Sequence, residues 1–174
     1  MLSPGAALAC ALALAALPVA LCGCGPQGPL GVIPGGPLAG RVEREALPDW
    51  RFTDSHATVA IETRGSWIDH SVTVLCSSEG PHLYVPSRHA PHKRWVQNVL
   101  RDPRVRIGVE DRIYEGRAVR VADPVEAERA ARAQLRKYVG IDPAVVRPLD
   151  GPPEPGDDRA EVWMFRIESV GADG

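Results

Sequence analysis

The first 40 residues of the sequence lack charged side chains. No Asp, Glu, Lys or Arg precedes Arg41, and residues 6–21 are almost wholly Ala, Leu and Val. An uncharged apolar run of this kind is typical of the core of an export signal. A membrane-spanning helix needs about 20 apolar residues, whereas this run is shorter and contains Pro18 near its end. The composition therefore favours export over a spanning helix.

Cysteine is too scarce for a disulfide framework. Two of the four cysteines, Cys10 and Cys22, lie within the export signal, and a third, Cys24, lies directly after it. Cys76 then has no partner for an internal disulfide. We expect Cys76 to be a buried small apolar side chain rather than a reactive thiol.

Basic charge and aromatic residues are also limited, and this argues against several functions. A net charge of −2 and an aromatic content of 5% provide no basic field and no base-stacking surface, so nucleic acid is not an expected partner. His89 and His92 form the closest histidine pair, but no Cys or carboxylate has a matching spacing, so no metal site is predicted. The motifs of hydrolases and nucleoside triphosphatases are absent.

The end of the apolar run resembles the lipobox of bacterial lipoproteins. Leu21 lies three residues before Cys24, and small Gly23 lies directly before it. The resemblance implies a signal peptide over residues 1–23, acylation of Cys24, and attachment to a membrane of the cell envelope on its periplasmic or extracytoplasmic face. A plain signal peptide and an uncleaved anchor are the alternatives.

The rest of the chain is long enough for one domain of ordinary size. Residues 24–40 are rich in Gly and Pro and uncharged, which is typical of a tether, and apolar periodicity places the folded domain at residues 41–170. Ser77–Pro81 is expected to be a turn and Pro148–Asp158 a loop. Helices are predicted at Pro91–Arg101 and from Pro124 to about Tyr138, the second with Asp123 as its N-terminal cap. Strands are predicted at Ala57–Thr63, His70–Cys76, His82–Pro86, Val105–Val109, Arg112–Val121 and Trp163–Glu168.

About six short antiparallel strands and two helices indicate a mainly β fold, a small barrel packed by helices. The strand His82–Pro86 leads into a basic loop and then into a helix. The N–H groups at a helix N-terminus attract anions, and the loop could add donors to a phosphate from Ser87, Arg88, His89, His92 and Lys93. A solvated basic loop is the alternative.

The segment from about Thr58 to Asp123 resembles the flavin split-barrel superfamily. This superfamily includes pyridoxamine 5'-phosphate oxidase-like proteins and the deazaflavin-dependent nitroreductase and quinone reductase family. The resemblance rests on Ser87, Arg88 and Lys93, then Trp95-Val96-Gln97-Asn98, Asp102-Pro103, the strand Val105–Val109, and Tyr114-Glu115-Gly116.

This resemblance implies a split β-barrel in which Lys93, with Ser87 and Arg88, contacts a cofactor phosphate. Trp95 and Asn98 occupy motif positions and are included as candidate cofactor contacts. The alternative is that Trp95 packs in the core and Asn98 ties the helix end to a loop. Such folds commonly pair as homodimers, with their sites at the interface.

The sequence also departs from these families. Many flavin-binding relatives have an Arg near the position of His70-Ser71, and only Arg64-Gly65-Ser66 approaches the Gly- and Arg-rich turn of the deazaflavin families. The sequence therefore does not decide whether the cofactor is FMN, a deazaflavin or haem, or whether the protein binds no cofactor.

Two functions follow as hypotheses. The first is a lipid-anchored oxidoreductase that uses a flavin or deazaflavin to reduce a small acceptor such as a quinone or nitro compound. The second is a non-enzymatic envelope lipoprotein whose barrel binds a ligand, including haem, or a partner. No catalytic side chain is assigned in either, because the cofactor would carry the chemistry.

Overall fold

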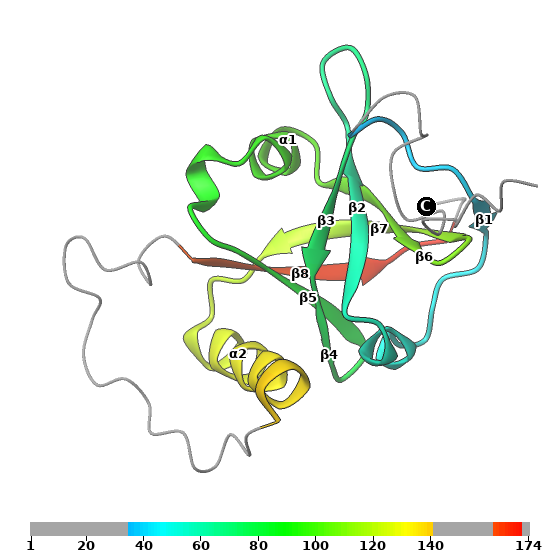
Figure 1. Cartoon of the computed structure of the whole chain (residues 1–174). Coiled ribbons are helices and arrows are strands. Elements are labelled where there is room, and N and C mark those ends of the chain that lie inside the picture. Colours follow the sequence, from blue (N-terminus) through cyan, green and yellow to red (C-terminus); the bar gives the residue numbers. More distant parts are fainter. Residues whose placement is uncertain (1–34, 141–161, 172–174) are drawn as a thin grey trace, which may run out of the picture.

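The computed structural model describes residues 35–140 and 162–171 (Figure 1). Among these residues lie eight strands, two short 3₁₀-helices and two α-helices. In chain order they are β1 (Arg41–Glu43), η1 (Arg51–Ser55), β2 (Thr58–Thr63), β3 (His70–Leu75), β4 (Ser77–Glu79), β5 (His82–Ser87), η2 (Ala90–His92), α1 (Arg94–Arg101), β6 (Arg104–Val109), β7 (Arg112–Arg120), α2 (Pro124–Val139) and β8 (Trp163–Ser169).

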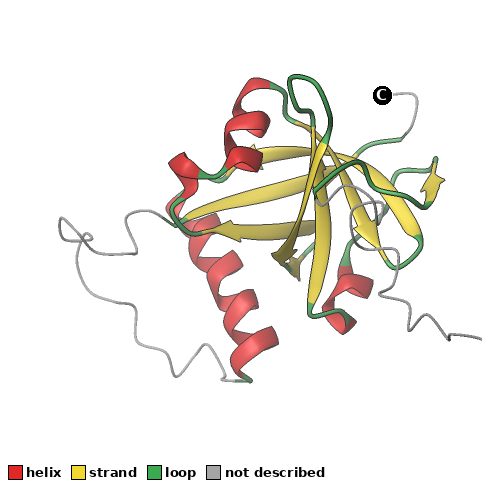
Figure 2. Ribbon diagram, turned by 45° about the horizontal axis from the view of Figure 1, so that its top comes forward, coloured by secondary structure: helices red, strands yellow, loops and turns green. Residues whose placement is uncertain are grey.

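The strands form one curled sheet in the order β3-β2-β6-β7-β8-β5-β4, and β1 pairs with β7 outside this path. All neighbouring strands along this path are antiparallel, whereas β1 is parallel to β7. Figure 2 shows the strands curving around a central core. Helix α2 packs against β4, and α1 lies beside β2 and β3. Among the described helices, none is long and apolar enough to cross a membrane.

The alternation of side chains explains how the sheet builds this core. In β6, Val105, Ile107 and Val109 are buried, whereas Arg104 is exposed and Arg106 is half-buried on the other face. Trp50 and Phe165 are fully buried in the same apolar cluster. Cys76 is also buried there and is a free thiol, as its isolation in the sequence predicted. The mainly β fold predicted from the sequence is confirmed.

Strand β4 is a correction to the sequence prediction, which placed a turn at Ser77–Pro81. Ser77 and Ser78 are buried and pair with Tyr84 and Leu83 of β5. The chain reverses only at Gly80, whose φ of 58° is in the left-handed region. Together with β1, this strand accounts for the two strands that the sequence pattern did not predict.

The helix predicted at Pro91–Arg101 is divided in two. The N–H groups of His92 and Lys93 donate to the carbonyls of His89 and Ala90, which closes the short helix η2. Lys93 then has an extended backbone (φ −79°, ψ 128°), so α1 begins only at Arg94. This break places an irregular basic loop between β5 and α1.

Residues 35–40, the end of the segment interpreted as a tether, pack against the sheet. The Leu38 side chain is 6% exposed and clusters with Ala60 and Ile113. Its N–H donates to the buried carboxylate of Glu62, and the Ser71 hydroxyl donates to the carbonyl of Gly36. The folded part therefore begins before Arg41. Residues 1–34, with Cys24, and the predicted loop Pro148–Asp158 lie outside the described residues.

Candidate functional site

The candidate site begins at Ser87, the last residue of β5. Ser87 pairs with Trp163 of β8 and is only 4% exposed. Its hydroxyl oxygen has no hydrogen-bond partner within the described part of the chain. Burying a hydroxyl without a partner is unfavourable. A water molecule or a ligand at this position would satisfy it.

The loop that follows Ser87 leads to the N-terminus of α1. His89 adopts a left-handed backbone conformation (φ 50°), and η2 turns the chain so that Lys93 becomes the residue preceding α1. No side chain caps the helix at Lys93. The first N–H groups of a helix have no partner within the helix, and the helix dipole makes this end electropositive.

Three cations surround this helix end. Arg88, Lys93 and Arg94 are exposed. Their side chains take part in none of the hydrogen bonds and ion pairs found among residues 35–140 and 162–171. By contrast, most arginines elsewhere in the fold face a carboxylate, as Arg166 does with Glu126 at 2.8 Å. The loop therefore combines unpaired positive charge with free N–H groups and a buried hydroxyl.

Trp95 and Asn98 face the interior of the protein. Trp95 is 4% exposed, and its ring meets that of Phe165 edge-on at 5.1 Å between centroids. Asn98 is 2% exposed, and its amide donates to the Thr63 hydroxyl at 3.0 Å and accepts from Arg101 at 2.5 Å. These contacts agree with the alternative interpretation of the sequence, in which Trp95 packs in the core and Asn98 ties the end of the helix to a neighbouring segment. A cofactor contact for either residue stays a prediction.

Two residues beside Ser87 were missed by the sequence analysis. Trp163 lies opposite Ser87 in the register of β5 and β8, and the Arg120 guanidinium stacks over the Trp163 ring at 3.6 Å. They add an aromatic face and a further cation next to the loop. Neither residue stands in a motif. Only the pairing of β7, β8 and β5, which no local pattern reveals, could have placed them here.

A separate pocket of about 590 Å³ opens between β2, β6 and β7. Its lining includes four arginines and three acidic residues, and no residue of the Ser87–Arg94 loop belongs to it. Among the arginines, Arg106 pairs with the buried Glu62 carboxylate at 2.8 Å. Arg104 pairs with Asp102 at 2.6 Å. Hydrogen bonds from Arg104 lower the pKa of Asp102 to about 2. The positive charge of this pocket is therefore partly neutralised by the protein itself.

Across the described ranges 35–140 and 162–171, no group of three or more His, Cys, Asp or Glu side chains is placed to hold a metal ion.

Comparison with known proteins yields matches in structure alone. No family model and no curated protein matches the sequence. A conserved hypothetical protein from Mycobacterium tuberculosis superposes with a TM-score of 0.50 at 20% identity, over 70% of this chain and 76% of that one. A Listeria innocua protein provisionally named as a pyridoxamine 5'-phosphate oxidase has a TM-score of 0.46 at 15% identity, over 67% and 86% of the two chains. An F420-H2-dependent reductase has a TM-score of 0.47 at 17% identity, over 65% and 95%.

At these identities the likeness concerns the fold. The curled antiparallel sheet with two helices has the split-barrel architecture that the sequence resemblance implied. A shared fold does not by itself assign a reaction.

Proposed function

We propose that this protein is a lipid-anchored oxidoreductase that uses a flavin or deazaflavin to reduce a small acceptor such as a quinone or nitro compound. The observation that carries the proposal is the buried Ser87 hydroxyl, which has no partner and lies at the start of the loop leading to α1. Unpaired cations lie on the same loop. This donor set suits the phosphate of a flavin-type cofactor.

Each group of the loop would have a distinct task in holding a phosphate. Ser87 would donate its hydroxyl hydrogen, and the fork of N–H groups on Arg88 would bind two oxygens at once. Lys93 would act as a mobile point charge, and the N–H groups at the start of α1 would face the remaining oxygens. The phosphate would thereby satisfy the one hydroxyl of this loop that the fold leaves buried without a partner.

The cofactor, when bound, supplies the hydride or electron-pair chemistry. The chain positions the cofactor and keeps water away from it. Trp163 is half-buried next to Ser87 and carries Arg120 on its ring. The pair offers an aromatic and cationic wall beside the phosphate position. No side-chain nucleophile is required, so the proposal assigns no catalytic residue.

The cellular setting belongs to the same proposal. The signal at residues 1–23 and the acylated Cys24 would place the protein on the extracytoplasmic face of a membrane. We also propose a homodimer with its sites at the interface, as is common in split-barrel proteins. The support for the anchor is the sequence of residues 6–24.

Cofactor binding by the purified full-length protein tests the proposal. FMN, a deazaflavin and haem would be added separately, and the bound molecule would be identified by its absorption spectrum and by mass spectrometry after release. We expect one FMN or deazaflavin per chain and reduction of a quinone in its presence. Binding of haem alone, or of no cofactor, would favour the non-enzymatic lipoprotein instead.

A further inference from the structure

The loop between β2 and β3, residues 64–69, projects from the body of the barrel (Figure 1). Its sequence is Arg-Gly-Ser-Trp-Ile-Asp. The Trp67 side chain is 97% exposed and that of the adjacent Ile68 is 56% exposed. The other three tryptophans are buried or half-buried. An exposed Trp-Ile pair on a projecting loop contributes little to the core, which points to a contact outside the barrel.

The loop is held in shape by the protein. The β2–β3 ladder is paired up to Thr63 and His70, and the Thr63 hydroxyl donates to the His70 carbonyl at 3.2 Å. Gly65 lies so close to the Ile68 carbonyl oxygen that any side chain at position 65 would collide with it. Trp67 and Ile68 are therefore presented on a compact, supported turn.

The N-terminal segment enters the fold at the base of this same loop. The Gly35 carbonyl accepts from the Ser71 N–H at 2.9 Å and lies 3.1 Å from Nδ1 of His70. The chain that precedes Gly35 carries the apolar run of residues 6–21 and Cys24. The chain that leads back to the proposed anchor at Cys24 therefore joins the described fold beside the loop that carries Trp67.

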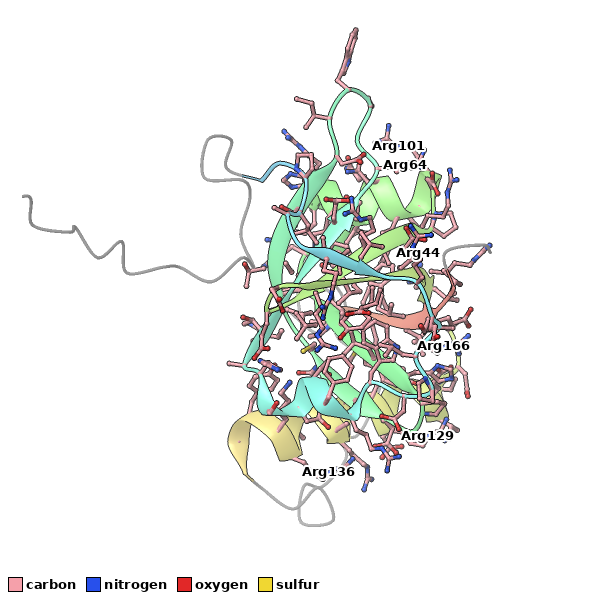
Figure 3. All side chains as sticks on the ribbon, turned by 90° about the vertical axis from the view of Figure 1, so that its right-hand side faces the viewer. Arg44, Arg64, Arg101, Arg129, Arg136 and Arg166 are labelled. Atoms are coloured by element: carbon pink, nitrogen blue, oxygen red, sulfur yellow. The ribbon has the colours of Figure 1, made fainter. Side chains whose placement is uncertain are left out.

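Cations flank the base of the loop. Arg64 is its first residue and has 61% of its side chain exposed. The Arg101 guanidinium, from the last residue of α1, donates to the Ser66 hydroxyl at 3.2 Å. Figure 3 shows the labelled Arg64 and Arg101 next to each other below the projecting loop. Two carboxylates lie near these arginines: Asp69 belongs to the loop, and Asp102 faces Arg64 at 3.9 Å between Nε and Oδ2.

We propose that residues 64–69 form a docking loop that inserts Trp67 and Ile68 into the interface of a lipid bilayer. Trp is favoured at the boundary between acyl chains and headgroups because its ring is apolar and its N–H remains wet. Arg64 and Arg101 would lie at the level of the lipid phosphates. The loop acts with the N-terminal attachment as a second membrane contact, which fixes the orientation of the barrel. This goes beyond the proposed oxidoreductase activity, and it rests on the membrane attachment that is part of the proposed function.

Quenching of tryptophan fluorescence by lipids tests the docking loop. The full-length protein would be reconstituted into vesicles of phosphatidylcholine and phosphatidylglycerol with brominated acyl chains, which quench only tryptophans in contact with them. We expect part of the emission to be quenched, and this component to be lost in Trp67→Phe. Trp163→Phe is the matched control and should retain the quenched component.

Two results would overturn the proposal. In one, Trp67→Phe and the wild type are quenched equally, so that Trp67 does not touch lipid. In the other, the emission assigned to Trp67 is shifted to shorter wavelength but escapes quenching, which would mean that a second copy of the chain covers it. Phenylalanine keeps the position apolar and exposed, so the variant is expected to fold. Cofactor binding is measured separately, and neither of these two results would bear on it.

Discussion

Asn98 is a buried polar residue whose hydrogen bonds connect α1 to β2. It donates to the Thr63 hydroxyl and accepts from Arg101, and Thr63 in turn donates to the His70 carbonyl. Removal of the Asn98 amide would leave these groups short of partners in a site with little access to water. We expect Asn98→Ala to lower the free energy of unfolding by about 1–3 kcal/mol.

Urea denaturation would measure this loss, with Gln97→Ala as the matched control. Gln97 is exposed and donates only to the Pro91 carbonyl, so its substitution should cost less than about 0.5 kcal/mol. If Asn98→Ala left stability unchanged and weakened cofactor binding instead, the structural role of Asn98 would be refuted in favour of direct contact.

Tyr84 gives the protein a pH dependence on the alkaline side. Burial, with the hydrogen bond donated to Glu126 at 2.9 Å, raises the pKa of Tyr84 to about 12. The unfolded chain ionises this group at about pH 10, so the folded state holds its proton more tightly. The resulting stabilisation is complete below about pH 10 and is lost as the pH rises from about 10 towards 12.

Comparison of the wild type with Tyr84→Phe isolates this effect. The variant lacks the ionisable group, so its free energy of unfolding should fall less between about pH 9 and about pH 11 than that of the wild type. Urea titrations at the two pH values measure the difference. Equal losses in the two proteins would show that another group dominates the alkaline transition.

At the scale of single residues, the sequence could name part of the candidate site but not all of the residues beside it. Ser87, Arg88 and Lys93 fall within one loop because they are close in sequence. The burial of the Ser87 hydroxyl without a partner depends on packing that no motif describes. Arg120 and Trp163 reach the site through strand pairing between distant segments, which lies beyond local sequence patterns.

Among the elements, residues 35–40 behave as a docked arm, which the Gly- and Pro-rich composition did not reveal. Leu38 covers Ala60 and Ile113, and Gly108 leaves room for it, since an added Cβ there would lie 3.1 Å from the Leu38 side chain. We expect Leu38→Ala to lower the free energy of unfolding by about 2–5 kcal/mol, because it leaves a cavity beneath the arm.

Val42→Ala is the control for the arm. Val42 lies in β1, a few residues later, and is 40% exposed, so we expect a change below about 0.5 kcal/mol. Hydrogen exchange would also report faster exchange of the Leu38 amide in Leu38→Ala, because that N–H is bonded to Glu62. A stability unchanged from the wild type would mean that the arm is not part of the cooperative fold.

Alternating strands and well-capped helices were the elements most readily predicted. Asp123 accepts from the N–H groups of Val125 and Glu126, and Pro124 opens α2, as the sequence indicated. Strand β4 escaped prediction because its Ser and Glu residues have the composition of a turn, although they pair with β5. The break at Lys93 escaped because Pro91 is typical of a helix start, whereas the apolar spacing begins only at Trp95.

At the scale of the whole molecule, we propose a split barrel that combines a phosphate-binding loop with a membrane anchor. The anchor is tested by Cys24→Ser in the native host. We expect the variant to lose its acyl groups and to be depleted from the membrane fraction, as measured by fractionation and by the mass of the N-terminal peptide. Undiminished membrane retention would count against acylation, whatever the cofactor proves to be.

The central claim is that the Ser87–Arg94 loop holds the phosphate of a flavin-type cofactor, and paired ligands test it most directly. Dissociation constants would be measured by fluorescence titration for FMN and riboflavin, which differ only in the phosphate, and for the corresponding deazaflavin pair. We predict that the wild type prefers the phosphorylated form by roughly 10- to 100-fold, which is the strength of one charge-assisted contact. Lys93→Ala should remove most of this preference. The control Arg132→Ala, on α2, should leave the preference intact. Equal affinity of the wild type for the phosphorylated and unphosphorylated ligands of both pairs, or a preference unchanged in Lys93→Ala, would contradict the account.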